Sequence, residues 1–170
     1  MSEVTEAPRG ISGGVVVGTD GSEGGRAALR FAAGEALVRS CPLHVVRAWT
    51  LANAPRPASA GFGEVPSLGE YEVAVRAELT GEIEEVLAGV PGAGQLQVVE
   101  HAVHGPAARV LVAASAEADL LVVGARGRGG FVGLLLGGIS DQVVRFSMCP
   151  VVIVPSRAAR QAVAAGQAAG

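Results

Sequence analysis

The chain has 170 residues, of which 49% are hydrophobic, and its mean hydropathy is +0.42. That length supplies one well-buried domain and is short for two. The net charge of −3 and the pI near 5.6 disfavour a nucleic-acid-binding protein, which needs a basic face.

Every one of the thirteen basic residues is an arginine. The absence of lysine excludes a Walker A phosphate loop and any chemistry that needs a lysine amine. The opening residues MSEVTEAPRG lack the apolar segment of a secretory signal, and Glu117 and Asp119 interrupt the apolar stretch VLVAASAEADLLVV. We therefore expect a cytoplasmic protein with no membrane partner and no nucleic-acid partner.

The first half of the chain alternates between strand and helix patterns. The apolar run at 13–21 predicts a buried strand that ends in a Gly-Thr-Asp-Gly turn, and helical spacing at 22–40 predicts a helix. A second strand is predicted at 42–49. Residues 50–68 hold three prolines and no periodicity, which indicates a long, mobile connection that is either functional or disordered. An amphipathic helix with an acidic outer face is predicted at 69–90.

The second half continues the alternation. A third strand is predicted at 95–103 and a helix at 105–118, where proline stands in the first turn. A fully apolar fourth strand follows at 119–125. After a glycine-rich segment, a short helix is predicted at 138–148 and a fifth strand at 149–155.

This alternation is typical of an α/β protein with an open parallel sheet and helices on both faces. We expect one domain over residues 13–155, between a flexible arm at 1–12 and a flexible tail at 156–170. Ligands of such sheets bind beyond the carboxyl ends of the strands, where the strand order reverses. If the first and fourth strands are central neighbours, the turns at 18–21 and 124–138 converge on one crevice.

The segment GARGRGGFVGLLLGGIS, residues 124–140, holds seven glycines in seventeen residues. Glycine costs roughly 0.5–1 kcal/mol relative to alanine inside ordered structure, so such a cluster needs a reason. A glycine loop between a buried strand and a helix N-terminus offers backbone N–H groups to a phosphate. The alternative is a flexible connection that permits close packing of helix against sheet.

The spacing of Gly124, Gly127 and Gly137 resembles the signature of the universal stress proteins: glycine, two residues, glycine, nine residues, glycine. VVVGTDGS also resembles the first strand of that family. GPAARVLVAASAEADLLVVGARGRGG resembles its third helix and fourth strand, and CPVVIVP its closing strand. The resemblance covers about residues 13–155. It implies a Rossmann-like sheet in the order 3-2-1-4-5 that binds ATP, with AMP or cyclic AMP as alternatives.

The resemblance also implies a set of residues around the nucleotide. Asp20 would lie beside it and hold a Mg²⁺ ion on the phosphates, and the backbone of Ala48 would hold the adenine. The implied contacts are Gly18, Thr19, Asp20, Ala48, Gly124, Ala125, Arg126, Gly127, Arg128, Gly129, Gly130, Gly137, Gly138, Ile139 and Ser140. The family usually dimerises through its fifth strand, which implies an interface at Pro150, Val151, Val152, Ile153 and Val154.

Gly138 stands where the family pattern has Ser or Thr, so we expect a weaker hold on the outer phosphates and a hydroxyl contact from Ser140 instead. Asp20 has an alternative role, because Asp-Gly-Ser also forms an Asx-turn that caps a helix. Arg126 and Arg128 either clamp phosphates or remain solvated.

We therefore expect a stress-response module that binds an adenine nucleotide and shows at most weak hydrolysis. Two alternatives stay open: a slow ATPase or adenylating enzyme of the same fold, and a homodimeric scaffold that binds no nucleotide. The three histidines show no metal-binding spacing and are expected to be structural, and no catalytic residue is assigned.

Overall fold

The computed structural model describes residues 7–61, 65–127 and 136–155. A five-stranded parallel sheet forms its centre, in the order β3-β2-β1-β4-β5, which confirms the predicted fold class and strand order. The strands are β1 (Val15–Gly18), β2 (Leu43–Trp49), β3 (Val98–His104), β4 (Leu120–Gly124) and β5 (Val151–Val154).

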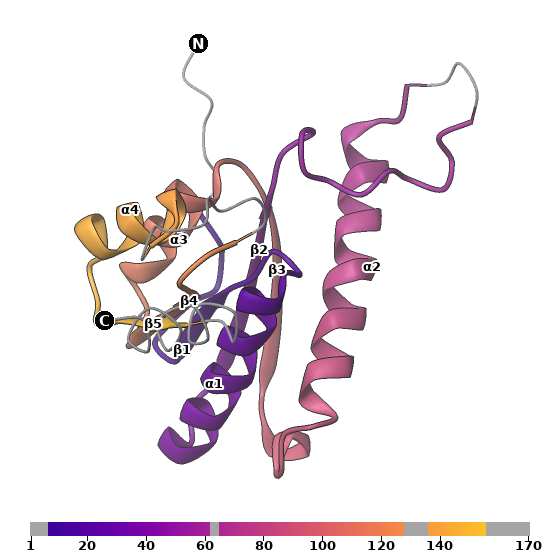
Figure 1. The fold of residues 1–170 in the computed structure, drawn as a ribbon. Helices are drawn as coiled ribbons and strands as arrows, with labels where there is room; N and C mark the ends of the chain where they lie inside the picture. Colours follow the sequence, from indigo (N-terminus) through magenta and orange to yellow (C-terminus); the bar gives the residue numbers. More distant parts are fainter. Residues whose placement is uncertain (1–6, 62–64, 128–135, 156–170) are drawn as a thin grey trace, which may run out of the picture.

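In the described part of the chain, four α-helices cover the two faces of this sheet (Figure 1). They are α1 (Glu23–Arg39), α2 (Leu68–Leu87), α3 (Ala107–Ser115) and α4 (Gly138–Phe146). Side chains of α1 and α2 pack on one face of the sheet and side chains of α3 and α4 on the other, so two hydrophobic clusters sandwich the strands. Central strands that are covered on both sides must be apolar throughout, which explains the unbroken apolar runs of β1 and β4.

Local sequence signals set most helix boundaries. Ser22 caps α1 by accepting a hydrogen bond from the N–H of Gly25, and α1 ends at Ser40, which adopts a left-handed conformation. Ser67 and Glu70 form a capping box at the start of α2. These side chains satisfy backbone groups that a helix end leaves unpaired, so they fix where each helix begins.

The predicted boundaries differ from the observed ones where a turn intervenes. The strand predicted at 95–103 begins at Val98, because Ala93–Gln95 form a 3₁₀ turn named η1. The helix predicted at 138–148 ends at Phe146, after which Ser147 is extended. The helix predicted at 69–90 ends at Leu87. Each change shortens an element without altering the order of elements.

The predicted arm at 1–12 is described from residue 7, and Ile11 is buried against the cluster beneath α3. The predicted tail at 156–170 lies outside the described residues, and so do residues 62–64 of the predicted loop. The flexibility of all three segments stays a prediction. No helix in the described part of the chain combines the length and apolarity needed to span a bilayer.

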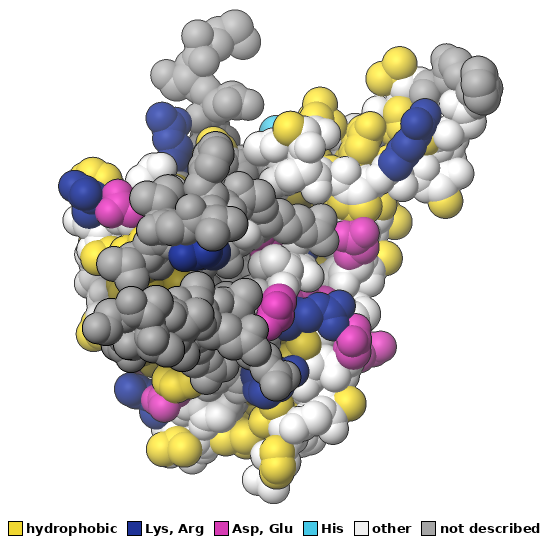
Figure 2. Space-filling model, viewed as in Figure 1, with side chains coloured by type: hydrophobic (Ala, Val, Ile, Leu, Met, Phe, Trp, Pro, Cys, Tyr) yellow, Lys and Arg dark blue, Asp and Glu magenta, His cyan; other side chains and the backbone are white. Residues whose placement is uncertain are grey.

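On the face shown in Figure 2, acidic and arginine side chains are interspersed over α1 and α2 and form no broad patch of one sign. Arg26 on α1 pairs with Glu85 on α2 at 2.7 Å, and Glu72 and Arg76 form an i,i+4 pair on α2. Such exposed pairs contribute at most about 1 kcal/mol each. They favour solubility more than they stabilise the fold.

Candidate functional site

Strands β1 and β4 are neighbours at the centre of the sheet, with Val17 paired with Val122. Because they run parallel, their carboxyl ends lie at the same edge. The turn that follows Gly18 and the glycine segment that begins at Gly124 are therefore adjacent. The strand order reverses between them, which is where ligands bind in open α/β sheets.

A pocket opens at this edge and contains about 470 Å³ of empty space, including the part open to solvent. Its described lining comprises Gly18, Thr19, Asp20, Gly25, Val46, Ala48, Ala107, Leu111, Val123, Gly124, Arg126, Gly127, Ile139 and Ser140. The lining combines apolar side chains from β2, β4 and α3 with polar side chains and glycine backbone.

Nine of the fifteen residues that the resemblance implied line this pocket: Gly18, Thr19, Asp20, Ala48, Gly124, Arg126, Gly127, Ile139 and Ser140. Ala125, Gly137 and Gly138 lie beside these residues in the chain and are not part of the described lining. Arg128, Gly129 and Gly130 lie outside the described residues.

The sequence analysis missed most of the apolar side chains of the lining and the first turn of α1. Leu111 and Ala107 come from α3, and Val46 comes from β2. No local sequence signal distinguishes them from ordinary core residues. The place of Gly25 in the pocket could have been predicted, because two adjacent glycines, Gly24 and Gly25, are as unusual at the start of a helix as the glycines at 124–130.

Two glycines hold the pocket edge together by close packing. A Cβ atom on Gly124 would lie 2.8 Å from the carbonyl carbon and oxygen of Gly24, so β4 and α1 touch through their backbones. A Cβ atom on Gly127 would lie 2.6 Å from Oδ2 of Asp20. Gly124 thus permits close packing of helix against sheet, which was the alternative role of the glycine segment. Gly127 leaves room for the Asp20 carboxylate.

Asp20 forms the turn that the sequence offered as its alternative role. Its Oδ1 accepts hydrogen bonds from the backbone N–H of Ser22 at 3.0 Å and from the Ser22 hydroxyl at 2.5 Å. Oδ2 faces Gly127 across the pocket edge. A divalent cation held by Asp20 would therefore have to use Oδ2. The nucleotide role of Asp20 remains a prediction beside this observed turn.

Two features of the pocket favour an anion. The guanidinium Nε of Arg126 is buried and has no hydrogen-bond partner in the part of the chain that the structure describes. Helix α4 begins at Gly137, and no described side chain caps it, so its first-turn N–H groups are not taken by a cap. A helix N-terminus and a guanidinium group both attract phosphate oxygens.

Ser140 has a different role from the expected one. It is only 4% exposed, and its hydroxyl donates a hydrogen bond to the carbonyl oxygen of Gly124 at 2.7 Å. This bond ties the first turn of α4 to the end of β4. A hydroxyl proton engaged in this way cannot also be donated to a phosphate oxygen. The expected phosphate contact from the Ser140 hydroxyl is therefore not supported by the geometry.

The sequence profile of the universal stress protein family matches residues 14–155. The chain belongs to the universal stress protein family. Relatives in this family include the universal stress protein Rv2623 of Mycobacterium tuberculosis, which is 34% identical over 139 residues. The universal stress protein Rv2005c of the same organism is 37% identical over 143 residues.

Each of these two alignments covers 82% of the chain and 44% of the relative, so the chain spans about half the length of the relatives it matches. Solved structures of universal stress proteins share the fold. A universal stress protein in complex with cAMP has a TM-score of 0.57 at 28% identity and covers 88% of this chain and 98% of that one. UspA from Lactobacillus plantarum has a TM-score of 0.62 at 20% identity and covers 85% of this chain and 97% of that one.

Proposed function

We propose that residues 13–155 form one domain that binds an adenine nucleotide in this pocket and acts as a regulatory module in a stress response. The observation that carries the proposal is the pocket itself, whose lining combines apolar side chains with the start of α4, which has no side-chain cap, and with Arg126, whose Nε has no hydrogen-bond partner among the described residues. Apolar side chains suit a base and the other two features suit a phosphate. The related structure in complex with cAMP supports this ligand class.

The end of β1 leaves a place for the adenine ring. The N–H of Thr19 bonds to the carbonyl of Val46, so backbone groups of β2 at this position point toward β1. Ala48 lies two residues further, and its backbone groups point to the same side, past the end of β1 at Gly18. We propose that these groups bind the adenine edge while Val46 and Leu111 contact the ring.

The phosphates are proposed to bind at α4, through backbone N–H groups and Arg126. The first turn of α1 is a poorer site, because the Ser22 hydroxyl already caps it by accepting from the N–H of Gly25 at 3.1 Å. Gly138 has no hydroxyl, and the hydroxyl of Ser140 is engaged with Gly124. Neither residue therefore offers a hydroxyl to the outer phosphates, so these phosphates add little to binding. The affinity for ATP is expected to lie within about tenfold of the affinity for AMP.

Replacing Gly127 with valine is expected to lower AMP affinity by at least about tenfold. The added Cβ would lie 2.6 Å from Oδ2 of Asp20, so the carboxylate would have to move into the pocket. Calorimetric titration of the full chain measures the effect. Gly34→Ala is the matched control, because an added Cβ there has nothing within 4 Å. Equal AMP affinity in Gly127→Val and the parent, with both folded, would place the ligand elsewhere.

We also propose a homodimer that forms through β5. This strand lies at the edge of the sheet, and its four residues are half-buried. The carbonyls of Pro150 and Val154 accept hydrogen bonds from β4, so by alternation the backbone groups of Val151 and Ile153 point toward the edge. Edge strands of this kind pair with other chains.

Light scattering of the full chain tests the dimer directly. We expect twice the mass of one chain at concentrations of tens of micromolar, because an apolar edge with outward-facing backbone groups gains hydrogen bonds on pairing. A single-chain mass across that range would rule out the β5 dimer.

A further inference from the structure

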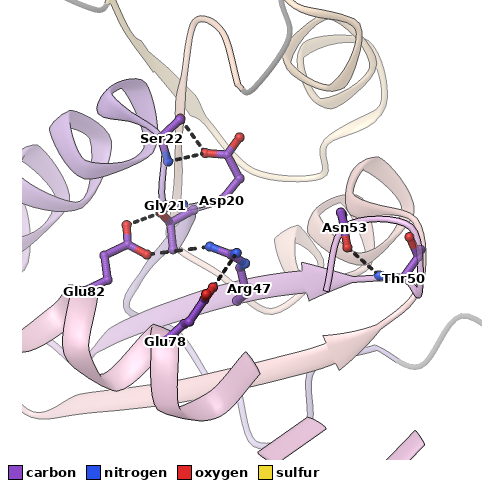
Figure 3. Close-up of polar contacts among 9 residues, drawn as sticks. Asp20, Gly21, Ser22, Arg47, Thr50, Asn53, Glu78 and Glu82 are labelled. Carbon is purple, nitrogen blue, oxygen red and sulfur yellow. Dashed lines mark hydrogen bonds and ion pairs between the residues drawn. The ribbon is translucent and has the colours of Figure 1, made fainter. Parts of the chain in front are cut away.

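Behind the turn that carries Asp20 lies a buried polar cluster, which we call the Thr19 cluster: Thr19, Arg47, Glu78 and Glu82. The Thr19 hydroxyl donates to Oε1 of Glu82 at 2.5 Å. Arg47 lies 3.4 Å from Glu78 and 3.9 Å from Glu82. Figure 3 shows both glutamates reaching from α2 toward Arg47 on β2. The cluster therefore joins the end of β1, β2 and α2.

Two charged members of the cluster are almost completely removed from water. Glu82 and Arg47 are each 5% exposed, whereas half of the Glu78 side chain is accessible. Burying a carboxylate is costly unless hydrogen bonds and opposite charges compensate. Oε2 of Glu82 has no hydrogen-bond partner among the described residues, and Oε1 accepts the hydrogen bond from Thr19. A carboxyl group that is buried at this cost in free energy indicates a role beyond packing.

The Thr19 side chain also fixes the turn that follows it. Its Oγ1 accepts the N–H of Gly21 at 3.2 Å while donating to Glu82. On the other side of the turn, Ser22 holds Oδ1 of Asp20. Asp20 thus lies between Thr19 and Ser22, whose side chains both form hydrogen bonds, and one bond of the Thr19 hydroxyl depends on a carboxylate of α2.

The charges around Glu82 link it to the pocket. Burial raises its pKa, while Thr19, Arg47 on β2 and Arg26 on α1 oppose that rise, and the negative charge of Asp20 adds to it. On α2 itself, Glu78 faces Arg47 and Glu85 pairs with Arg26. A change of charge beside Asp20 therefore alters the electrostatic potential at Glu82 directly, in addition to any effect that the turn transmits.

We propose that Glu82 is a positioning residue for nucleotide binding, which fixes the Thr19 hydroxyl and so the turn that presents Asp20 to the pocket. The inference rests on the proposed function. Helix α2 contributes none of the described pocket lining, and its buried residues Val75, Leu79, Glu82, Ile83 and Val86 all face the sheet. The docking of α2 and the occupancy of the pocket are then coupled. By linkage, each favours the other to the same degree.

Three variants of α2 test the role. Glu82→Leu removes the acceptor for Thr19, and AMP affinity is expected to fall by about tenfold, the effect of one lost hydrogen bond of moderate strength. Glu82→Gln keeps an oxygen acceptor and is expected to retain affinity within about threefold of the parent. Glu78→Gln is the matched control one turn earlier on the helix, where the carboxylate contacts Arg47 and not Thr19, and its affinity is expected to equal that of the parent.

Thermal unfolding separates positioning from simple stability. Glu82→Leu leaves the buried Arg47 with Glu78 as its remaining carboxylate partner, which is destabilising, so thermal unfolding must first show that the variant is folded at the temperature of the titration. If Glu82→Leu does not fold, Thr19→Val removes the donor of the same bond and is expected to lose the same AMP affinity. Because Thr19 also lines the pocket, Thr19→Ser, which keeps the hydroxyl, is its control and is expected to bind like the parent.

The possible results are distinct. Weak binding by Glu82→Leu, together with near-parent binding by Glu82→Gln and Glu78→Gln, supports the positioning role. Parent-like affinity in Glu82→Leu, or in Thr19→Val if that variant has to be used, overturns it. Equal losses in Glu82→Leu and Glu82→Gln would also overturn it, because the acceptor oxygen would then be irrelevant. A parent that binds no AMP refutes the proposed function itself, and the positioning role with it.

Discussion

Replacing Gly124 with alanine is expected to destabilise the fold by about 1–3 kcal/mol, the usual range for a side-chain atom forced into a closed contact. The new Cβ would lie 2.8 Å from both the carbonyl carbon and the oxygen of Gly24. Both are backbone atoms of α1, so no side chain can rotate away to relieve the clash. The start of α1 would have to move off β4, which also opens the pocket edge. Urea unfolding followed by circular dichroism measures the change in the unfolding midpoint.

Gly34→Ala in α1 is the control for this experiment. An added Cβ there has nothing within 4 Å, and alanine favours a helix interior by about 1 kcal/mol over glycine. The control is therefore expected to raise the midpoint while Gly124→Ala lowers it. Similar midpoints for Gly124→Ala and the parent would mean that β4 and α1 do not touch as the structure has them.

Acidification from pH 7.5 to 4.5 is expected to lower the free energy of unfolding by roughly 2–3 kcal/mol through His101 alone. Nδ1 of His44 and Nε2 of His101 lie 3.0 Å apart, and the two side chains are 3% and 8% exposed. Burial, with smaller contributions from the neighbouring His44 and Arg76, lowers the pKa of His101 from 6.5 to about 4. Burial also lowers the pKa of His44.

The direction of this change in stability follows from which state, folded or unfolded, binds the proton. Above pH 6.5 the His101 ring is neutral in both states, so it costs no stability there. As the pH falls toward 4, the unfolded chain takes up a proton that the folded chain rejects, and the folded state loses stability. Comparison with His101→Leu isolates this contribution, because the variant keeps all other titrating groups. Parallel stability curves for the parent and the variant from pH 7.5 to 4.5 would contradict the assignment.

The fold was predictable because its signals are local. Unbroken apolar runs predicted the buried strands, and helical spacing at 22–40 predicted α1. The order of the strands came from the resemblance to the universal stress proteins, since periodicity alone does not decide which strands are neighbours. The 3₁₀ turn at Ala93–Gln95 was missed because a single turn of helix has no periodicity.

The pocket was predictable only in part, because much of it depends on contacts between distant residues. Thr19 and Glu82 are 63 positions apart, and neither carries a motif that indicates their hydrogen bond. Ser140 lies 16 positions from Gly124, and only the docking of α4 on β4 reveals that its hydroxyl is engaged. The close approach of Gly24 and Gly124 likewise arises from packing. The sequence predicted where the crevice lies, and the three-dimensional contacts show which bonds its side chains form.

Calorimetric titration of the full chain with AMP tests the central claim most directly, with uridine monophosphate as the matched ligand. The phosphate end of both ligands is the same, so the comparison reports on the base. We predict saturable binding of one AMP per chain, with ATP within about tenfold of AMP and uridine monophosphate weaker by about tenfold or more. An absence of saturable heat with AMP, ATP and cyclic AMP at ligand concentrations of about 1 mM would contradict the assignment of this pocket to an adenine nucleotide.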